Sequence, residues 1–175
     1  KHNGVKGFGE AVPYARYGES LTSVKAQIET LPDIFTRQQL HDLLPAGSAR
    51  NAVDCALWDV EAKVTGKRVW ELAGLASPNP VITAFTISLD TPEKMRTQAQ
   101  RNCFRPLLKI KLGTPDDMPR LEAIRQGAPL SDIIVDANEG WNAETYAELA
   151  PDLLRLGVKL VEQPLPAEND EALLE

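Results

Sequence analysis

The sequence predicts an α/β fold in which parallel strands alternate with helices, and three short apolar segments carry this prediction. They cover residues 107–112, 133–136 and 158–162, and each has a charged residue at or near its C-terminal end. The two segments between them have helical periodicity, so the order is strand, helix, strand, helix, strand. This alternation is typical of a parallel sheet with crossover helices.

Four charged residues lie at the ends of these strands: Lys109, Lys111, Asp136 and Glu162. The step from Lys109 to Asp136 is 27 residues and the step from Asp136 to Glu162 is 26, which fits one strand and one helix per repeat. Reactive groups in parallel α/β folds collect at the C-terminal ends of strands. We therefore expect the four side chains to meet at the active end of the sheet.

The rest of the chain divides at a break in composition, Ser77-Pro78-Asn79-Pro80, which predicts a boundary between residues 1–77 and 78–175. After the break we expect a further strand over residues 80–88, ahead of the three described above. Before it we expect a strand over residues 5–12, whose two glycines indicate a bulge or a close backbone approach. Helices are predicted over residues 21–31, 36–44 and 49–65.

The composition excludes several functional classes. The net charge is −6, with 19 Lys and Arg against 25 Asp and Glu, which argues against a nucleic-acid or anionic membrane surface. No apolar run approaches the ~20 residues that span a bilayer. Cys55 and Cys103 lack metal-ligand spacing and are predicted to be small buried residues. They indicate a reducing compartment, so we expect a cytoplasmic protein.

Both ends of the sequence suggest a portion of a longer polypeptide. Residues 1–4 look like a hairpin turn entered midway, and residues 168–175 begin a helix that the last residue cuts off. We therefore expect a chain that is truncated at both ends.

Lys109 and Lys111 lie on the same face of the predicted strand, roughly 6 to 7 Å apart. On an edge strand such a pair is a solubilising device. On a central strand the two ammonium groups would be buried or at the mouth of a cavity, where like charges lower the pKa of at least one lysine. A lysine adjusted in this way removes a proton near neutral pH.

Asp136 and Glu162 predict a metal site, because neighbouring strands lie about 4.8 Å apart and two carboxylates at one level can share an ion. Mg²⁺ fits better than zinc, since no His or Cys lies nearby. Each carboxylate alone has a plainer interpretation as a helix cap or a salt bridge, but the lysine pair favours the metal site. A cation that binds a substrate carboxylate favours an enediolate, so the predicted chemistry is α-proton abstraction by a lysine.

These strand-end motifs resemble those of the muconate-lactonizing subgroup of the enolase superfamily. Lys109-Ile110-Lys111 resembles the Lys-x-Lys of its second barrel strand, and residues 135–138 and 161–164 resemble its two metal-binding strands. Residues 48–59 resemble the helix that links a capping domain to the barrel. The resemblance implies a partial TIM (β/α) barrel over residues 78–175, preceded by part of an α+β capping domain over residues 1–77.

Within the subgroup, residues 13–20 and 136–141 are most similar to the L-Ala-D/L-Glu dipeptide epimerases. The resemblance implies that Lys111 is an acid/base, that Lys109 adjusts its pKa, and that Asp136 and Glu162 bind Mg²⁺. It also implies that Thr86, at the mouth of the first barrel strand, contacts the substrate. Arg16, in the loop over residues 13–20, is a further candidate for substrate contact, although an arginine in a loop more often anchors the loop itself.

The implied function is a Mg²⁺-dependent dipeptide epimerase of cell-wall peptide metabolism, which abstracts the α-proton through a metal-stabilised enolate. The resemblance also requires a third acidic ligand, an opposing lysine and further acidic residues on later barrel strands. None lies within these 175 residues, so the segment alone is expected to be inactive. Muconate cycloisomerization, o-succinylbenzoate synthesis and a non-catalytic fragment remain alternatives, and a homo-oligomer is left open.

Overall fold

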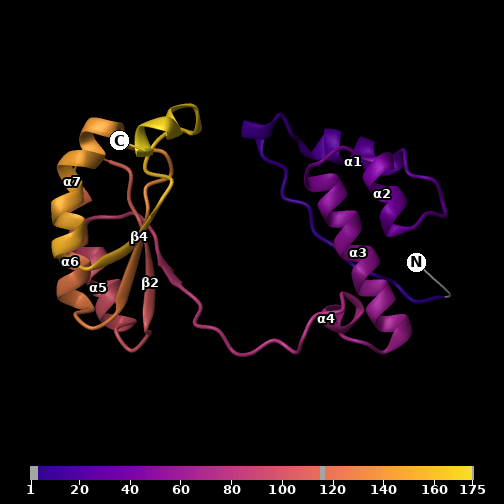
Figure 1. Ribbon diagram of the computed structural model, residues 1–175, viewed down its shortest axis with the longest axis horizontal. Coiled ribbons are helices and arrows are strands. Elements are labelled where there is room, and N and C mark those ends of the chain that lie inside the picture. The colour runs from indigo at the N-terminus through magenta and orange to yellow at the C-terminus, as the bar shows by residue number, and fades with distance from the viewer. Residues whose placement is uncertain (1–3, 115–116, 175) are drawn as a thin grey trace. The chain divides into compact units, whose positions relative to one another are not determined.

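The computed structural model describes residues 4–114 and 117–174, apart from the side chain of Asp170. The chain forms two compact units, Lys1–Asn79 and Pro80–Glu175 (Figure 1), which we call the helical unit and the sheet unit. Residues 75–84 are exposed and have neither helix nor strand. The assignment of residues 1–77 to a capping domain and 78–175 to a barrel stays a prediction. The turn expected at residues 1–4 falls on residues 1–3, which lie outside the described residues.

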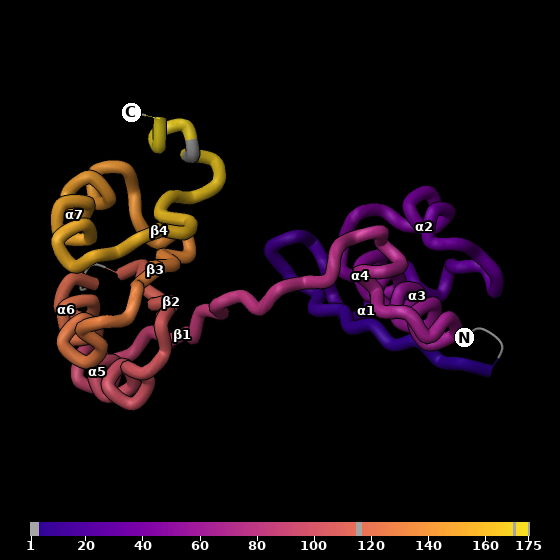
Figure 2. Tube along the Cα trace, turned by 60° about the horizontal axis from the view of Figure 1, so that its bottom comes forward, coloured from indigo at the N-terminus to yellow at the C-terminus, as the bar shows by residue number. Residues whose placement is uncertain are grey.

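The sheet unit contains four parallel strands in the order β1-β2-β3-β4, each joined to the next through a helix. The strands are β1 (Phe85–Ile87), β2 (Leu107–Lys111), β3 (Asp132–Asp136) and β4 (Val158–Glu162). The crossover helices are α5 (Pro92–Arg101), α6 (Asp117–Gly127) and α7 (Ala143–Arg155). These helices lie side by side along one face of the strands (Figure 2). This arrangement confirms the predicted α/β fold with a parallel sheet.

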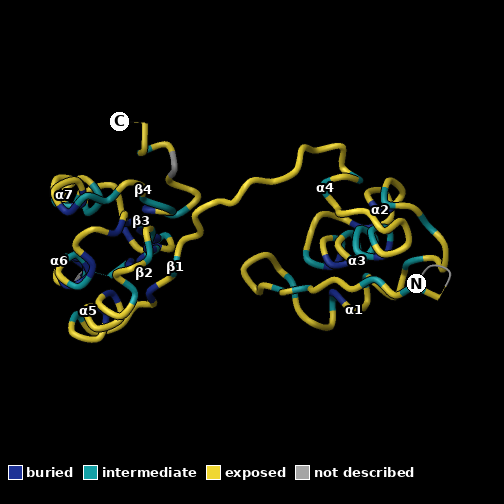
Figure 3. Tube along the Cα trace, turned by 90° about the horizontal axis from the view of Figure 1, so that it is seen from below, coloured by how far each residue is buried: buried dark blue, intermediate teal, exposed yellow. Residues whose placement is uncertain are grey.

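One face of the sheet forms the core against the helices. On β2 and β3, every second residue points to the helices and is fully buried, as are Leu108, Ile110, Ile133 and Val135. These residues pack in one cluster with helix side chains, namely Met95 of α5, Leu121 and Ile124 of α6, and Leu153 of α7. Figure 3 shows buried segments, in dark blue, on the strands and on the helices that cover them. Because strand side chains alternate between faces, Lys109 and Lys111 lie on the face that the helices do not cover.

Two ends of the sheet unit differ from the prediction. The first strand begins at Phe85, because β2 begins at Leu107 and offers no partner to the residues that precede Ala84. The expected helix at the C-terminus is instead a 3₁₀ segment, η2 (Ala167–Leu174), with a kink at Asn169.

The described residues of the helical unit form four α-helices and one 3₁₀ turn. They are η1 (Ala15–Tyr17), α1 (Leu21–Glu29), α2 (Arg37–Leu43), α3 (Ser48–Thr65) and α4 (Val69–Leu72). Ser20 and Thr36 close capping boxes at the starts of α1 and α2, which satisfy the first free amides of each helix. Val24, Leu40, Leu44 and Ala49 form its buried core.

Residues 5–12 do not form the predicted strand, because Val5 makes a single β-bridge and residues 6–12 have no strand partner in the described ranges. They lie instead against α3, where the Asp59 carboxylate accepts a hydrogen bond of 2.8 Å from the Phe8 amide. A Cβ atom on Gly9 would lie 1.9 Å from the carbonyl oxygen of Ala52, and one on Gly7 would lie 2.0 Å from that of Ala56. The close backbone approach that the two glycines predicted is therefore confirmed.

Replacing Gly9 with alanine is expected to lower the free energy of unfolding by about 3 kcal/mol, because the added methyl group meets the backbone of α3 and one of the two segments must move. Chemical denaturation of the intact protein measures the change. Lys6→Ala is the matched control, since Lys6 is exposed on the same extended segment, and it should change the stability by less than about 0.5 kcal/mol. Equal stability of the two variants would contradict the packing of this segment on α3.

Two further sequence predictions concern burial and membranes. Cys55 and Cys103 are exposed and free in the described structure, so the prediction that they are buried is wrong. Cys55 lies on α3, whose buried residues are Ala49, Ala52 and Val60, and Cys103 lies in the turn that follows α5. None of the helices within the described residues has the length and apolar character needed to cross a membrane.

Candidate active site

The pairing of the strands brings the predicted charged residues onto one face of the sheet. Lys111 pairs with Asp136, and Asp136 pairs with Glu162, so these three residues form a row across β2, β3 and β4. Lys109 lies two residues before Lys111 and therefore has the same facing. We call Lys109, Lys111, Asp136 and Glu162 the charged cluster.

A β-bulge between β3 and β4 is needed for this row. Ile133 pairs with Val158, but Ile134 pairs with Leu160, so Lys159 is an extra residue in β4. Without the bulge Asp136 would pair with Val161, and Glu162 would point to the opposite face, because a shift of one residue reverses the facing of a strand. The bulge therefore places Glu162 beside Asp136.

The charged cluster forms one connected set of ion pairs. The Lys111 ammonium group lies 2.6 Å from Asp136 Oδ2 and 3.0 Å from Asn138 Oδ1. The Lys109 ammonium group lies 3.0 Å from the same Asp136 oxygen and also donates to Glu162 Oε2. Asp136 is 2% exposed, whereas the Glu162 side chain is 43% exposed. The buried carboxylate thus has two cationic partners, and the exposed carboxylate has one.

These contacts shift the pKa values of two groups in the cluster. Burial alone raises the pKa of Asp136, but hydrogen bonds from Lys111, Lys109 and the Asn138 amide outweigh it and hold the pKa below its ordinary value. Hydrogen bonds to Glu162 and then Asp136 raise the pKa of Lys109. The sequence predicts that two like charges lower the pKa of at least one lysine. For Lys109 this is wrong, because two carboxylates lie within hydrogen-bond distance of its ammonium group and raise its pKa.

The loops after the strands continue the hydrogen bonding of the sheet. The Leu112 amide donates to Asp136 O at 2.9 Å, and the Ala137 amide donates to Glu162 O at 3.0 Å. Farther along, the amides of Glu139 and Trp141 donate to Gln163 O and Pro164 O. Asn138, Glu139 and Gln163 have positive φ angles of 48°, 63° and 47°. Such conformations cost free energy and are common at functional sites.

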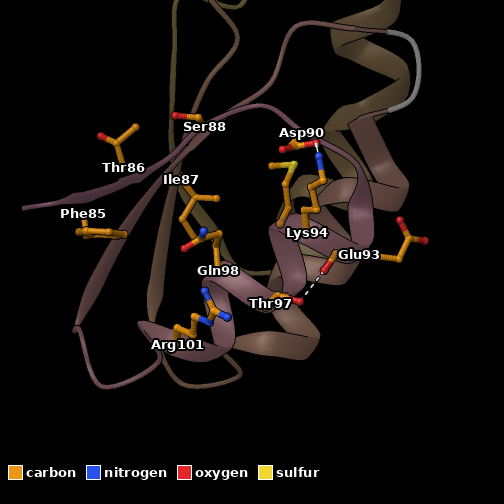
Figure 4. Close-up of a pocket in the computed structure, with 11 residues that line it drawn as sticks. Phe85, Thr86, Ile87, Ser88, Asp90, Glu93, Lys94, Thr97, Gln98 and Arg101 are labelled. Atoms are coloured by element: carbon orange, nitrogen blue, oxygen red, sulfur yellow. Dashed lines mark hydrogen bonds and ion pairs between the residues drawn. The ribbon is translucent and has the colours of Figure 1, made fainter.

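Thr86 is on β1 and pairs with Lys109, which gives it the same facing as the charged cluster. In Figure 4 it points away from α5, whereas its neighbour Ile87 points toward that helix. Thr86 also lines a pocket along β1 and α5 that includes Lys94, Gln98 and Arg101. No contact with a substrate is shown, so its predicted role stays a prediction.

Arg16 lies in η1 of the helical unit, where its guanidinium group lies 5.9 Å from the centre of the Tyr17 ring. The four residues of the charged cluster all belong to the sheet unit. The structure therefore brings Lys109, Lys111, Asp136 and Glu162 together, and substrate binding by Arg16 stays a prediction.

Sequence reasoning missed Asp117, a buried carboxylate at the start of α6. It accepts hydrogen bonds from the loop after β2 and from the Trp141 indole in the loop after β3. The signal available in the sequence was weak: an acidic residue shortly after Lys111, between Gly113 and an expected helix. Its meaning depends on Trp141, which is far away in the sequence.

The carboxylates of the charged cluster fit a shared divalent cation. One ammonium group, that of Lys109, already contacts oxygens of both Asp136 and Glu162, so the two side chains converge on a single positive charge. Both are hard oxygen donors of the kind that Mg²⁺ and Ca²⁺ prefer. The described residues supply no third Asp, Glu, His or Cys to this group.

Comparison with known families agrees with this geometry. Residues 1–74 match the mandelate racemase / muconate lactonizing enzyme N-terminal domain, and residues 91–175 match the enolase C-terminal domain-like family. The chain belongs to the enolase superfamily. The resemblance noted in the strand-end motifs is thereby confirmed.

Two curated relatives of this enolase-superfamily chain are epimerases or racemases. It is 45% identical to the L-Ala-D/L-Glu epimerase of Escherichia coli, over 99% of this chain and 56% of the relative. It is 44% identical to an N-acetyl-D-glutamate racemase of Pseudoalteromonas, over 96% of this chain and 55% of the relative. The chain thus spans about half the length of the curated relatives that it matches.

Solved structures agree with the same superfamily fold. An enolase family member from Agrobacterium tumefaciens with homology to dipeptide epimerases, with bound sodium and L-Ala-L-Glu, has a TM-score of 0.92 and 48% identity, over 99% of this chain and 54% of that one. A dipeptide epimerase from Methylococcus capsulatus, complexed with Mg and L-Arg-D-Lys, has a TM-score of 0.82 and 28% identity, over 99% of this chain and 54% of that one.

Proposed function

We propose that the intact protein is a Mg²⁺-dependent dipeptide epimerase of the L-Ala-D/L-Glu type, which inverts the α-carbon of glutamate by proton abstraction. The observation that carries the proposal is the row formed by Lys111, Asp136 and Glu162, in which a basic side chain lies beside two carboxylates that share a cation. The epimerase functions of the Escherichia coli and Methylococcus capsulatus relatives support the choice of reaction.

Asp136 and Glu162 would hold the Mg²⁺. The bound cation supplies a Lewis acid that stabilises negative charge on the substrate carboxylate as the α-proton leaves. Asp136 is fixed for this task, because its Oδ1 accepts a hydrogen bond of 3.0 Å from the Asn138 amide. Lys109 contacts both carboxylates, so a bound ion would replace at least one of these contacts, and Lys109 would stay on the same face of β2 as Lys111.

Lys111 would act as the base. As a neutral amine it accepts the α-proton of the glutamate residue, and the electron pair of the broken C–H bond moves into the carboxylate to form an enolate. Return of a proton from Lys111 to the same face restores the original configuration. Inversion requires delivery from the other face by a second acid, which the resemblance assigns to a lysine outside these 175 residues.

The substrate would be a dipeptide, contacted by Thr86 and Arg16. A cytoplasmic location is part of the proposal and is supported by two free cysteines, which suit a reducing compartment.

An exchange experiment tests the function. The intact protein is incubated with Mg²⁺ and L-Ala-L-Glu in D₂O, and proton NMR follows the glutamate Cα–H signal. We expect this signal to disappear while the L-Ala-D-Glu diastereomer accumulates, and removal of the ion with EDTA should stop both changes. Absence of exchange in the presence of Mg²⁺ would reject the proposal.

One second candidate has a specific finding in its favour, the 44% identity to an N-acetyl-D-glutamate racemase. L-Ala-Glu and N-acetylglutamate both carry a glutamate whose nitrogen is acylated, so the same proton is removed in both. The same experiment with N-acetyl-L-glutamate decides between them. Faster exchange with the dipeptide is expected, because the proposed function assigns the alanine residue to the binding site.

A further inference from the structure

We propose that Asp117 is a positioning residue that ties the loop after β2 to the loop after β3 and thereby holds Lys111 and Asp136 in place for proton transfer. The inference rests on the proposed function for its meaning in catalysis. The tie itself is a structural claim that can be tested without turnover.

Asp117 binds both loops with one carboxylate. Its Oδ2 atom accepts hydrogen bonds from the Gly113 amide at 2.7 Å, the Thr114 amide at 2.8 Å and the Trp141 indole at 2.8 Å. Its Oδ1 atom accepts a hydrogen bond of 2.9 Å from the Thr114 hydroxyl group, and Arg120 lies 3.5 Å away. The side chain is 1% exposed, so water does not compete for these contacts.

The two loops are also packed backbone to backbone. A Cβ atom on Gly113 would lie 2.2 Å from the Ala137 carbonyl oxygen, and one on Gly140 would lie 2.4 Å from that of Gly113. Trp141 is buried and stacks on Tyr146 with 6.1 Å between ring centres. The loops therefore meet along their backbones and are joined at one side by the carboxylate of Asp117.

The joined positions are close in sequence to the charged cluster. Gly113 follows Lys111 by two residues, and Trp141 ends the loop that begins after Asp136. A displacement of one loop relative to the other changes the distance between the proposed base and the proposed metal ligand. Errors of about 1 Å in the position of a reacting group lower turnover by about 10²-fold.

Trp141→Phe tests the inference, because it removes the indole donor and keeps an aromatic ring to stack on Tyr146. Ser131→Ala is the matched control. It removes one buried donor, the hydroxyl group that donates to Arg105 O at 2.8 Å, at the start of β3, away from the charged cluster. Both variants are made in the intact protein, and their thermal unfolding midpoints are expected to fall by similar amounts.

Two readouts then separate positioning from general stability. Amide hydrogen exchange should become about tenfold faster at residues 112–114 and 137–141 in Trp141→Phe and stay unchanged there in Ser131→Ala. The kcat for epimerization of L-Ala-L-Glu should fall about 10- to 100-fold in Trp141→Phe, with KM within about twofold, and stay near the unmodified value in Ser131→Ala. Asp117→Asn should show the same pattern as Trp141→Phe. It retains the indole, but its amide nitrogen would face either the Thr114 hydroxyl group or the three N–H groups that donate to Oδ2 of Asp117.

Equal losses of kcat in Trp141→Phe and Ser131→Ala would overturn the inference, and so would unchanged amide exchange in both Trp141→Phe and Asp117→Asn. If the unmodified protein does not epimerize the dipeptide, the proposed function fails. The amide exchange experiment still decides whether Asp117 ties the two loops.

Discussion

Lys111→Ala is expected to abolish deuterium incorporation at the glutamate α-carbon of L-Ala-L-Glu, with a loss of about 10²- to 10⁴-fold, the usual contribution of a general base. The ammonium group of Lys111 lies 2.6 Å from Asp136, in the row that also contains Glu162. Lys109 also contacts Asp136, but its partner across the sheet is Ile134, so it lies outside this row. Proton NMR of the intact variant in D₂O with Mg²⁺ measures the loss.

The control separates loss of the base from loss of the cation. Lys111→Ala should still bind Mg²⁺ in a calorimetric titration, because Asp136 and Glu162 are retained. Lys94→Ala, which removes an exposed lysine of α5, should exchange at the rate of the unmodified protein. Full exchange by Lys111→Ala would reject this residue as a base.

Asp136→Asn is expected to weaken Mg²⁺ binding by at least about 100-fold. The substitution keeps the shape of the side chain but removes the charge of a carboxylate that is 2% exposed and contacts two ammonium groups. Without this charge, the ammonium groups of Lys109 and Lys111 lack a buried counter-charge. Their positive charges then further disfavour the binding of Mg²⁺ at this position. Calorimetric titration of Mg²⁺ into the intact variant measures the affinity.

Asp132→Asn is the matched control, since Asp132 lies at the other end of the same strand and is exposed. It should bind Mg²⁺ as the unmodified protein does. Retention of tight binding by Asp136→Asn, or an equal loss in both variants, would place the ion elsewhere.

Much of the sheet unit could be predicted from the sequence because its signals are local. The apolar runs of β2, β3 and β4 are short and lie between helical segments, and their charged ends fall at nearly equal spacing. When strands and helices repeat at equal spacing along the sequence, the C-terminal ends of the parallel strands lie along the same side of the sheet. The meeting of Lys109 and Lys111 with Asp136 needed only this rule and the alternation of strand side chains.

The features that the sequence could not predict depend on distant partners. The position of Glu162 in the cluster was predicted, but the bulge that produces its facing was not, because nothing in the run from Val158 to Glu162 marks Lys159 as an extra residue. Asp117 looks like an ordinary residue at the start of a helix until Trp141 is seen to donate to it. Residues 5–12 have a strand-like pattern, but a strand also needs a neighbour, and α3 takes that place.

The central claim is that Asp136 and Glu162 grip one divalent cation while Lys111 faces the substrate α-carbon. A crystal structure of the intact protein with Mg²⁺ and L-Ala-L-Glu tests it most directly. We expect an oxygen of each carboxylate at about 2.0–2.1 Å from the ion and Lys111 Nζ at about 3–3.5 Å from the glutamate α-carbon. An ion bound without either carboxylate, or a Lys111 amine turned away from that carbon, would contradict the account.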